Sequence, residues 1–299
     1  MGAPGTARVR VDRELVRRGL VRSREEALAA VAAHRVQVDG APVRKPSTLV
    51  RTDQRLIVGG PPPRFVSRGG EKLVHALEVF ATMGVDPRGR RVLDAGMSTG
   101  GFTDCLLQAG AAAVVGVDVG YGQAAEALRR DPRVTILERT NVRGLDAAAI
   151  GGRVDALVAD LSFISLATVL PALLPLVAGD WAVVLVKPQF EVGREAVGRD
   201  GVVRDAEGWR HALERCSAAA TREGWHLAAV VPSPLRGPAG NVEFLALLRP
   251  GGGPGDRAAG EAGAISAALA AVVPDAALVG TEGAAHAEDA EHGTGEPTA

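Results

Sequence analysis

The stretch "LDAGMSTGGFTD", from Leu93 to Asp104, decides the fold that the rest of the chain has to match. It begins as an apolar strand pattern, passes through a glycine-rich turn and continues as a helical pattern. Gly96, Gly100 and Gly101 lack Cβ atoms, so a ligand can approach the backbone and the N-terminus of the following helix. This order is typical of a nucleotide-type site in a doubly wound α/β domain. A tight turn that binds nothing is the structural alternative, because a glycine-rich loop alone is a weak signal.

Strand and helix patterns alternate on both sides of this loop, between residues 67 and 250. A run such as "AVVLV", residues 182–186, is apolar throughout, as in the buried strand of a parallel sheet. Seven stretches have a strand pattern: "RVLDAG", "AVVGVDVG", "RVTILE", "VDALVAD", "AVVLVK", "HLAAVVPS" and "VEFLALL". Repeated βα units predict a mainly parallel, seven-stranded, Rossmann-like sheet covered by helices.

Residues 1–60 read as a small separate α+β domain. Val11, Leu15 and Leu20 fall roughly on one face of a first predicted helix. A second helix is predicted to begin at Ser23, whose hydroxyl can cap it while Glu26 reaches back as a capping box. The valines of "RVQVDGAPV", residues 35–43, then lead into an Asp-Gly pair, which is a strong hairpin signal.

Basic residues gather in this first domain. Residues 1–60 carry 12 basic and 6 acidic groups, whereas residues 251–299 carry 1 and 8. We therefore expect the first domain to contact nucleic acid, the alternative being a merely solvated charged face. Its two helices and hairpin resemble the small RNA-binding module first recognised in a small-subunit ribosomal protein. The arginines expected to contact RNA, here and beside the linker, are Arg17, Arg18, Arg22, Arg24, Arg35, Arg64 and Arg68.

The two domains are expected to be joined and followed by segments without a core of their own. The proline-rich stretch "GGPPPR", residues 59–64, is typical of a stiff linker, and we assign the linker to residues 61–66. Residues 251–299 are rich in glycine, alanine and acidic side chains, so we predict a mostly disordered tail with one helix at most, near "AISAALAAVV".

Cysteine use and hydropathy narrow the class of protein. Cys105 and Cys216 lie far apart, which predicts neither a disulfide framework nor a metal site, and reduced thiols favour the cytoplasm. The stretch "VLPALLPLVAG" is short and interrupted by Pro171 and Pro175, which argues against a membrane span. We expect no metal and no membrane partner.

Lysine is rare in this chain, and its positions are informative. Only three of the 34 basic residues are lysines, namely Lys45, Lys72 and Lys187. Lysine can lose its proton in a protein, whereas arginine effectively cannot, so a retained lysine can indicate chemistry beyond charge.

Several ionisable residues fall where strands of the predicted sheet end. Asp160 ends the fourth strand and Lys187 the fifth, so a carboxylate and an amine reach the crevice where such sheets bind ligands. Lys72, before the first strand, and Glu243, at the last one, can complete this group. Two structural ion pairs are the alternative, because such networks also occupy strand ends.

The glycine loop could serve three chemistries. A nicotinamide enzyme would have a second glycine where Ser98 stands. A serine hydrolase could use residues 96–100 as G-x-S-x-G, but the later histidines lie within helix and strand patterns and no "HGGG" loop precedes them. An acid before the loop, Asp94, fits S-adenosylmethionine better, since it can help to hold the amino-acid end of that cofactor. Asp118 lies 22 positions after Gly96, the usual offset for an acid that binds ribose hydroxyls.

The combined motifs resemble one family. They are "VSRGGEKL", "LDAGMSTGGFTD", "VDVGYGQ", "ERTNVR", "ADLSFISL", "VKPQFEVGRE", "GVVRD" and "SPLRGPAGNVEF". Together they are similar to the TlyA-type ribosomal RNA 2′-O-methyltransferases, relatives of the FtsJ/RrmJ fold, over about residues 8–250. Departures include Met97 in the loop, His34 in the first domain and "RFV" in the linker.

The resemblance implies a cytoplasmic, S-adenosylmethionine-dependent enzyme that methylates ribose 2′-hydroxyls, typically of cytidine, in ribosomal RNA or ribosomal subunits. Its Lys-Asp-Lys-Glu tetrad maps onto Lys72, Asp160, Lys187 and Glu243, with Lys187 the candidate general base. The cofactor-binding residues that we predict are Asp94, Gly96, Ser98, Thr99, Gly100, Gly101, Phe102, Asp118, Asn141 and Asp160. Two alternatives remain open: an RNA-binding protein with an inactive methyltransferase fold, and the membrane-active protein suggested by the older family label "haemolysin".

Overall fold

The structure is a computed structural model that describes residues 8–21, 23–60, 63–193, 195, 197–251 and 254–272. The chain divides into two compact units, residues 1–160 with 176–179, and residues 161–175 with 180–299. Each unit is described in turn.

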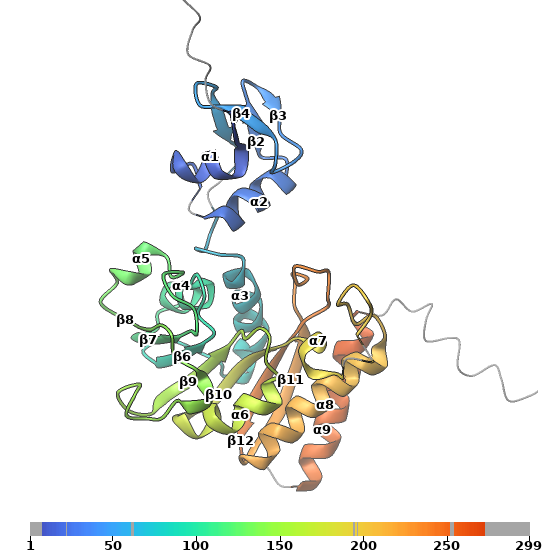
Figure 1. Cartoon of the computed structure of the whole chain (residues 1–299). Coiled ribbons are helices and arrows are strands. Elements are labelled where there is room, and N and C mark those ends of the chain that lie inside the picture. Colours follow the sequence, from blue (N-terminus) through green and yellow to red (C-terminus); the bar gives the residue numbers. More distant parts are fainter. Residues whose placement is uncertain are drawn as a thin grey trace, which may run out of the picture. The chain divides into compact units, whose positions relative to one another are not determined.

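The first unit begins with a small domain of two helices and five short strands (Figure 1). Its elements are β1 (Arg8–Arg10), α1 (Val11–Arg17), α2 (Arg24–Ala32), β2 (Val36–Val38), β3 (Ala41–Pro42), β4 (Leu49–Arg51) and β5 (Leu56–Val58). Strand β1 pairs with β4, and β2 pairs with both β3 and β5, all antiparallel. The hairpin is where the Asp-Gly pair predicts it, because Asp39 and Gly40 have φ of 51° and 84°, as a tight hairpin turn requires.

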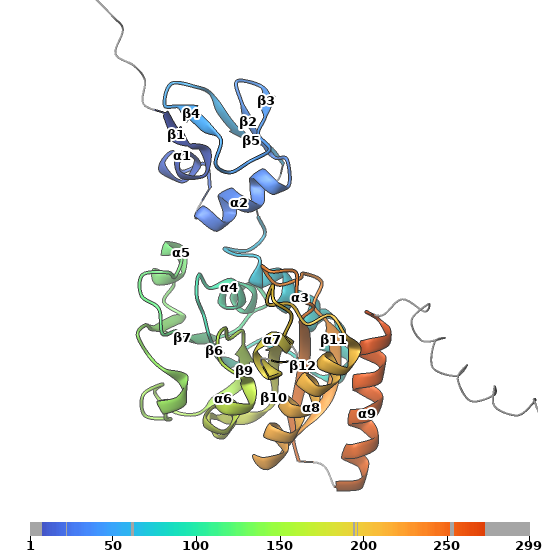
Figure 2. The same cartoon turned by 45° about the vertical axis from the view of Figure 1, so that its right-hand side comes forward.

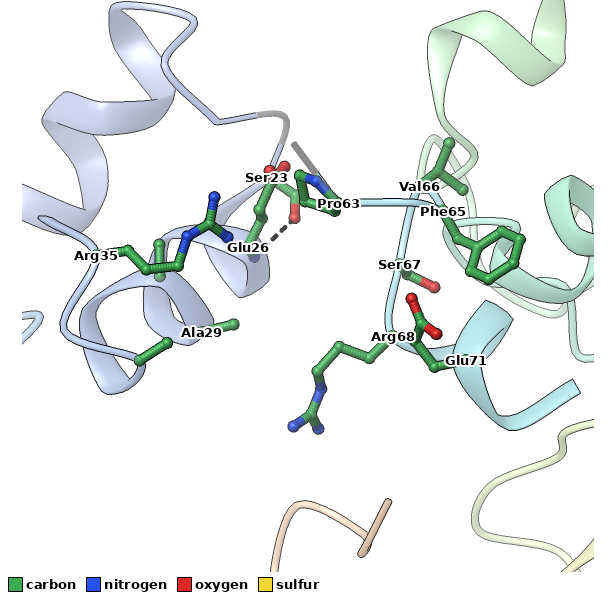
Figure 3. Close-up of a pocket in the computed structure, with 12 residues that line it drawn as sticks. Ser23, Glu26, Ala29, Arg35, Pro63, Phe65, Val66, Ser67, Arg68 and Glu71 are labelled. Atoms are coloured by element: carbon green, nitrogen blue, oxygen red, sulfur yellow. Dashed lines mark hydrogen bonds between the residues drawn. The ribbon is translucent and has the colours of Figure 1, made fainter. Parts of the chain in front are cut away.

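The helices of this small domain follow the predicted pattern with one exception. Val11 and Leu15 are fully buried, but Leu20 is 39% exposed. The prediction for Leu20 is wrong because α1 ends at Arg17, so the helical period no longer directs residue 20 toward the core. Ser23 caps α2 as predicted, its hydroxyl accepting a hydrogen bond from the Glu26 amide at 3.1 Å (Figure 3).

The rest of the first unit contains four parallel strands and the helices between them. In chain order these are α3 (Gly69–Phe80), η1 (Ala81–Met83), β6 (Arg91–Ala95), α4 (Gly101–Gln108), β7 (Ala113–Val117), α5 (Glu126–Arg129), β8 (Val134–Leu137), η2 (Val142–Gly144) and β9 (Val154–Ala159). Strand β6 pairs in parallel with β7 and β9, and β7 with β8. The loops after these strands therefore leave the sheet at one edge.

The predicted linker carries packing residues at its end. Phe65 is 2% exposed, and a Cβ atom on Gly70 would lie 2.2 Å from its ring (Figure 3). The amide of Val66 donates to Asp104 at 2.8 Å. Residues 65 and 66 are thus packed against α3 and α4, while residues 61 and 62 lie outside the described part of the chain.

The second unit contributes the remaining elements of the sheet and its covering helices. They are α6 (Leu166–Leu173), η3 (Leu174–Leu176), β10 (Val177–Val186), α7 (Pro188–Glu191), α8 (Ala206–Arg222), β11 (Trp225–Pro232), β12 (Phe244–Pro250) and α9 (Pro254–Ala270). Strand β12 runs antiparallel to both β10 and β11. The seven-stranded sheet has the order β11-β12-β10-β9-β6-β7-β8, so the predicted α/β fold is confirmed, with β12 as its reversed strand.

The segment after residue 250 differs from the predicted tail. Helix α9 begins at Pro254, earlier than the expected "AISAALAAVV" stretch, and packs on β11 and α8 (Figure 2). Ile265, Ala268 and Leu269 are buried at 4%, 2% and 5% exposure. The composition misled the prediction because two large apolar residues spaced i, i+4, among alanines, suffice to cover part of a sheet. The tail beyond residue 272 lies outside the described residues.

Candidate functional site

The glycine-rich loop after β6 has a backbone that ordinary residues would strain. Gly100 has φ of 98°, and a Cβ atom there would lie 2.2 Å from Cδ1 of Leu128. Gly96 and the exposed Ser98 also have positive φ, of 88° and 49°. The Thr99 carbonyl accepts a hydrogen bond from the Ala125 amide at 3.0 Å. The loop is therefore held in one shape, with Ser98 facing outward.

Gly101 and Phe102, which were predicted to bind the cofactor, make packing contacts with the start of α3. A Cβ atom on Gly101 would lie 2.8 Å from the Gly70 backbone nitrogen and 2.3 Å from the Ser67 hydroxyl. Phe102 is 3% exposed and lies near Gly69. In the described structure these residues let α4 approach the start of α3.

Asp94 is fully buried at the end of β6. Its Oδ2 accepts a hydrogen bond from the Thr103 hydroxyl at 2.6 Å, whereas its Oδ1 is buried with no hydrogen-bond partner among the described residues. Burial raises the pKa of Asp94 to about 7, and the nearby charges of Asp160 and Asp118 act in the same direction. A buried acceptor without a partner is costly, so this oxygen is suited to a ligand that brings a donor.

Asp118 follows β7 and faces the glycine loop, as its spacing predicts. Its Oδ2 accepts from the Ser98 amide at 2.8 Å, and its Oδ1 from the Gly120 amide at 2.6 Å. The Thr140 amide donates to the Asp118 carbonyl at 2.9 Å, which brings the segment containing Asn141 to the same loop. The Asn141 side chain itself caps η2 by accepting from the Arg143 amide.

Met97, one of the departures from the family pattern, lies inside the fold. It is 4% exposed, and a Cβ atom on Gly116 would lie 2.1 Å from its sulfur. Its side chain therefore occupies the space that the glycine of β7 leaves.

The other predicted residues of the first unit lie at strand and helix ends. The Asp160 amide, just after β9, donates to the Ala95 carbonyl at the end of β6 at 3.0 Å. Lys72 lies in the first turn of α3 and is 8% exposed. A lysine buried to this extent is uncommon and fits a functional group.

The second unit holds Lys187 directly after β10, where the backbone turns into α7. The side chain is 8% exposed, and Nζ donates to the Ser162 hydroxyl at 2.8 Å. The apolar run ahead of it fixes the strand, and Pro188 starts the helix, so the amine is presented at the strand end. Ser162 was not predicted, although it follows Asp160 by only two positions.

Glu243 lies just before β12 and is 2% exposed. A Cβ atom on Gly237 would lie 2.6 Å from its Oε1, so that glycine leaves space for the carboxylate. Asn241 accepts from the Val203 amide and donates to the Gly201 carbonyl, each at 2.9 Å, and so fixes the segment that leads to Glu243.

Two further groups beside Lys187 were missed from sequence. Phe163 is 92% exposed with φ of 64°, and its ring lies 5.5 Å from that of Phe190. Glu191 is buried and accepts from the Ser165 hydroxyl at 2.5 Å and the Leu166 amide at 2.6 Å, while burial raises its pKa. The first is an exposed aromatic surface, and the second caps α6.

The predicted RNA-binding arginines divide into two groups. Arg18 donates to the Gln54 and Thr52 carbonyls, and Arg35 donates to the Gly59 carbonyl. Both side chains therefore stabilise the main chain of the small domain. The arginines whose side chains are exposed are Arg17, Arg24, Arg64 and Arg68. Arg22 lies outside the described residues.

The described residues also bear on metals and membranes. No group of three or more His, Cys, Asp or Glu side chains suited to a metal ion occurs among them, and Cys105 and Cys216 are buried free thiols. In the same part of the chain, no helix has both the length and the apolar character needed to cross a bilayer.

Comparison with known proteins matches both parts of the chain. The profile of the FtsJ-like methyltransferases matches residues 65–249, and that of the S4 domain matches residues 9–56. The 16S/23S rRNA (cytidine-2′-O)-methyltransferase TlyA of Mycobacterium tuberculosis is 56% identical over 244 residues, which cover 81% of this chain and 90% of the relative.

Two further relatives have names of another kind. Hemolysin A of Brachyspira hyodysenteriae is 33% identical over 241 residues, covering 80% of this chain and 98% of the relative. A solved Streptococcus thermophilus protein with a provisional hemolysin name aligns with a TM-score of 0.68 and 37% identity, over 88% of this chain and 96% of its own. The chain therefore belongs to the FtsJ-like methyltransferase family, in the TlyA group, and carries an S4 domain ahead of the methyltransferase domain.

Proposed function

We propose that this enzyme uses S-adenosylmethionine to methylate the ribose 2′-hydroxyl of cytidine in ribosomal RNA, within the cytoplasm. The observation that carries the proposal is the buried amine of Lys187 at the end of β10, held by Ser162. The activity named for the M. tuberculosis relative supports the choice of reaction and substrate.

The residues after β6 and β7 fit the cofactor. Bound there, S-adenosylmethionine would supply an electrophilic methyl group. Asp94 offers a buried oxygen without a described partner to the cofactor's ammonium group. Asp118 remains able to accept ribose hydroxyls, because each carboxylate oxygen has two lone pairs and only one amide donor in the structure.

Lys187 is proposed to act as the general base. A 2′-hydroxyl is a weak nucleophile, so transfer of its proton to a neutral Nζ helps its oxygen to bond to the methyl carbon as the sulfur–methyl bond breaks. The pairing of β10 with β12 supports grouping Lys187 with Glu243, since Val186 lies opposite Phe244. The resemblance to the family adds Asp160 to this group. Lys72 is the fourth member and supplies a cation that orients the carboxylates.

The RNA substrate is supported by features of both units. The S4 domain offers exposed arginines for phosphates. Phe163 directly follows Ser162, the hydrogen-bond partner of Lys187, and its ring is exposed. Exposed aromatic rings stack on unpaired RNA bases.

The direct test is transfer of labelled methyl groups to purified ribosomal subunits that lack ribose methylation. We expect label in ribosomal RNA, and nucleotide mapping should place it on the 2′-oxygen of cytidine. Label on a base, or in protein alone, would contradict the proposed reaction.

A further inference from the structure

Two segments of the second unit are joined beside the candidate base. They are residues 162–166, which lead into α6, and residues 187–191, which lead into and form α7. At one end of this pair, Nζ of Lys187 donates to the Ser162 hydroxyl at 2.8 Å. At the other end lies Glu191, the last residue of α7, which is only 2% exposed.

Glu191 bonds to the far end of the first segment through both of its carboxylate oxygens. Oε2 accepts from the Ser165 hydroxyl at 2.5 Å, and Oε1 accepts from the Leu166 amide at 2.6 Å. Between the two ends, the rings of Phe163 and Phe190 lie 5.5 Å apart. The hydrogen bonds join residues that are 25 or 26 positions apart, so the two segments run in the same direction.

The first segment contains a backbone conformation that needs outside support. Phe163 has φ of 64°, in the left-handed region that a bulky side chain rarely adopts. Such a residue persists only where its surroundings fix it. Here Ser162 is fixed on one side by Lys187, and the start of α6 is fixed on the other side by Glu191. Without Glu191, the segment can relax its backbone and move the Ser162 hydroxyl away from the amine.

We propose that Glu191 is a positioning residue for methyl transfer, which fixes residues 162–166 so that the Ser162 hydroxyl stays bonded to Nζ of Lys187. This inference rests on the proposed function, in which Lys187 is the general base. The alternative is a purely structural carboxylate, whose loss would lower stability without changing the chemistry.

Three variants separate position from charge and from stability. Glu191→Ala removes both hydrogen bonds. Glu191→Gln removes the charge but keeps both contacts, because its oxygen can accept from the Leu166 amide and its NH2 can donate to the Ser165 oxygen. Glu261→Ala is the matched control, because Glu261 also accepts from a serine hydroxyl and a backbone amide, on α8 and β11.

The first measurement is single-turnover methyl transfer to ribosomal subunits, with the binding of subunits and cofactor measured separately. We expect Glu191→Ala to slow transfer by at least about tenfold with binding retained, as for a displaced catalytic group. Glu191→Gln and Glu261→Ala should stay close to wild type. Adding Ser162→Ala to Glu191→Ala should cost little more, because both act through one hydrogen bond. Losses that multiply would overturn the inference, as would an equal loss in Glu191→Gln, which would show an effect of charge.

The second measurement does not depend on methyl transfer. The chain has only three lysines, so acetylation of Lys187 by acetic anhydride can be followed by mass spectrometry, with the exposed Lys45 as internal reference. The hydrogen bond to Ser162 favours the protonated amine, which does not react. Glu191→Ala and Ser162→Ala should therefore each speed labelling of Lys187 by about fivefold, as for one ordinary hydrogen bond, whereas Glu191→Gln should not. Wild-type labelling in a folded Glu191→Ala protein would refute the positioning role.

The two proposals fail separately. If the wild-type chain transfers no methyl group but labelling responds as expected, the proposed function fails while the positioning role stands. If Glu191→Ala unfolds, as judged by circular dichroism, Ser165→Ala takes its place, since it removes one of the two contacts of Glu191. It should change transfer and labelling in the same directions by smaller amounts, and wild-type values of both would overturn the inference.

Discussion

Two aspartates, Asp12 in the S4 domain and Asp94 in the methyltransferase domain, are both 0% exposed. Their pKa values are nevertheless shifted in opposite directions. Hydrogen bonds, first of all from Arg10, lower the pKa of Asp12 to about 2. Burial raises the pKa of Asp94 to about 7, against one hydrogen bond from Thr103. The contrast comes from what surrounds each group, because Asp12 lies beneath two partly exposed arginines whereas Asp94 lies deep in its domain, where desolvation dominates.

The difference separates a buried carboxylate whose charge is already paired from one that has no cationic partner among the described residues. Asp12 already has two cations, so its role is to position them. Asp94 has no cation among its described partners, so it is suited to receive a charged ligand. Lys187 is a third buried ionisable group, and its amine donates to the Ser162 hydroxyl.

Lys187→Arg should have the largest effect. If Lys187 were only a structural cation, arginine would keep the charge and most of the activity. As a general base it has to give up its proton, which arginine cannot do. We expect single-turnover methyl transfer to slow by at least about a hundredfold, with cofactor and RNA binding retained.

Lys72→Arg is the matched substitution. If Lys72 supplies charge and orientation, it should be better tolerated. A Lys187→Arg enzyme within a few-fold of wild type would leave positioning of hydroxyl and methyl as the main source of rate.

Ending the chain at Pro250 should have the next largest effect. Glu261 of α9 accepts hydrogen bonds from the Ser217 hydroxyl and the Leu227 amide, which attach the helix to α8 and β11. Losing α9 also exposes the surface that Ile265 and Leu269 cover, which costs about 2 kcal/mol after allowance for a compact unfolded state. We expect Tm to fall by roughly 6 °C in calorimetry. A chain ending at Val272 is the control, and equal Tm values for the two truncations would contradict a stabilising α9.

Asp94→Asn should weaken S-adenosylmethionine binding by about tenfold at pH 8, the loss of one hydrogen bond to a charged group. A cationic amino group favours ionised Asp94, so wild-type affinity should rise with pH until it passes the pKa of about 7 and then level off. The Asn variant should lack this rise. Parallel pH profiles from calorimetry would show that Asp94 does not face the cofactor's charge.

The smallest effects are expected in stability, where the two aspartates should differ in sign. The raised pKa of Asp94 gives stability that is present at low pH and lost as pH rises through about 7, so Asp94→Asn should raise Tm by a few degrees at pH 8. The lowered pKa of Asp12 gives stability that is present above the usual aspartate range and lost as pH falls toward about 2. Asp12→Asn should therefore lower Tm at pH 8, and shifts of the same sign would refute the contrast.

The sequence predicts most of the fold because its signals are local. Continuous apolar runs give the seven strands, and the Asp39-Gly40 pair gives the hairpin. What it misses depends on contacts between distant segments. Helix α9 resembles a tail in composition, and its burial depends on β11 and α8. Leu20 matches a helical period that ends three residues earlier.

The candidate site is predictable to the level of strand ends. Asp94, Asp118, Asp160 and Lys187 all lie where strands finish, as expected from parallel topology. The roles of Gly101 and Phe102 were not predictable in this way, because their packing partners lie on α3, some 30 positions earlier in the chain. The ion pair of Asp12 with Arg24 depends in the same way on a contact between two helices, α1 and α2.

The position of β12 has a consequence for how the protein is made. It is the last strand of the described chain to be synthesised, yet it lies between β11 and β10. Until it emerges from the ribosome, the edges of β10 and β11 that it will occupy have no partner, and unpaired edges invite association between nascent chains. The methyltransferase domain thus completes its sheet only after β12 has been made, and a chain interrupted before residue 244 would combine a folded S4 domain with a sheet that is still open.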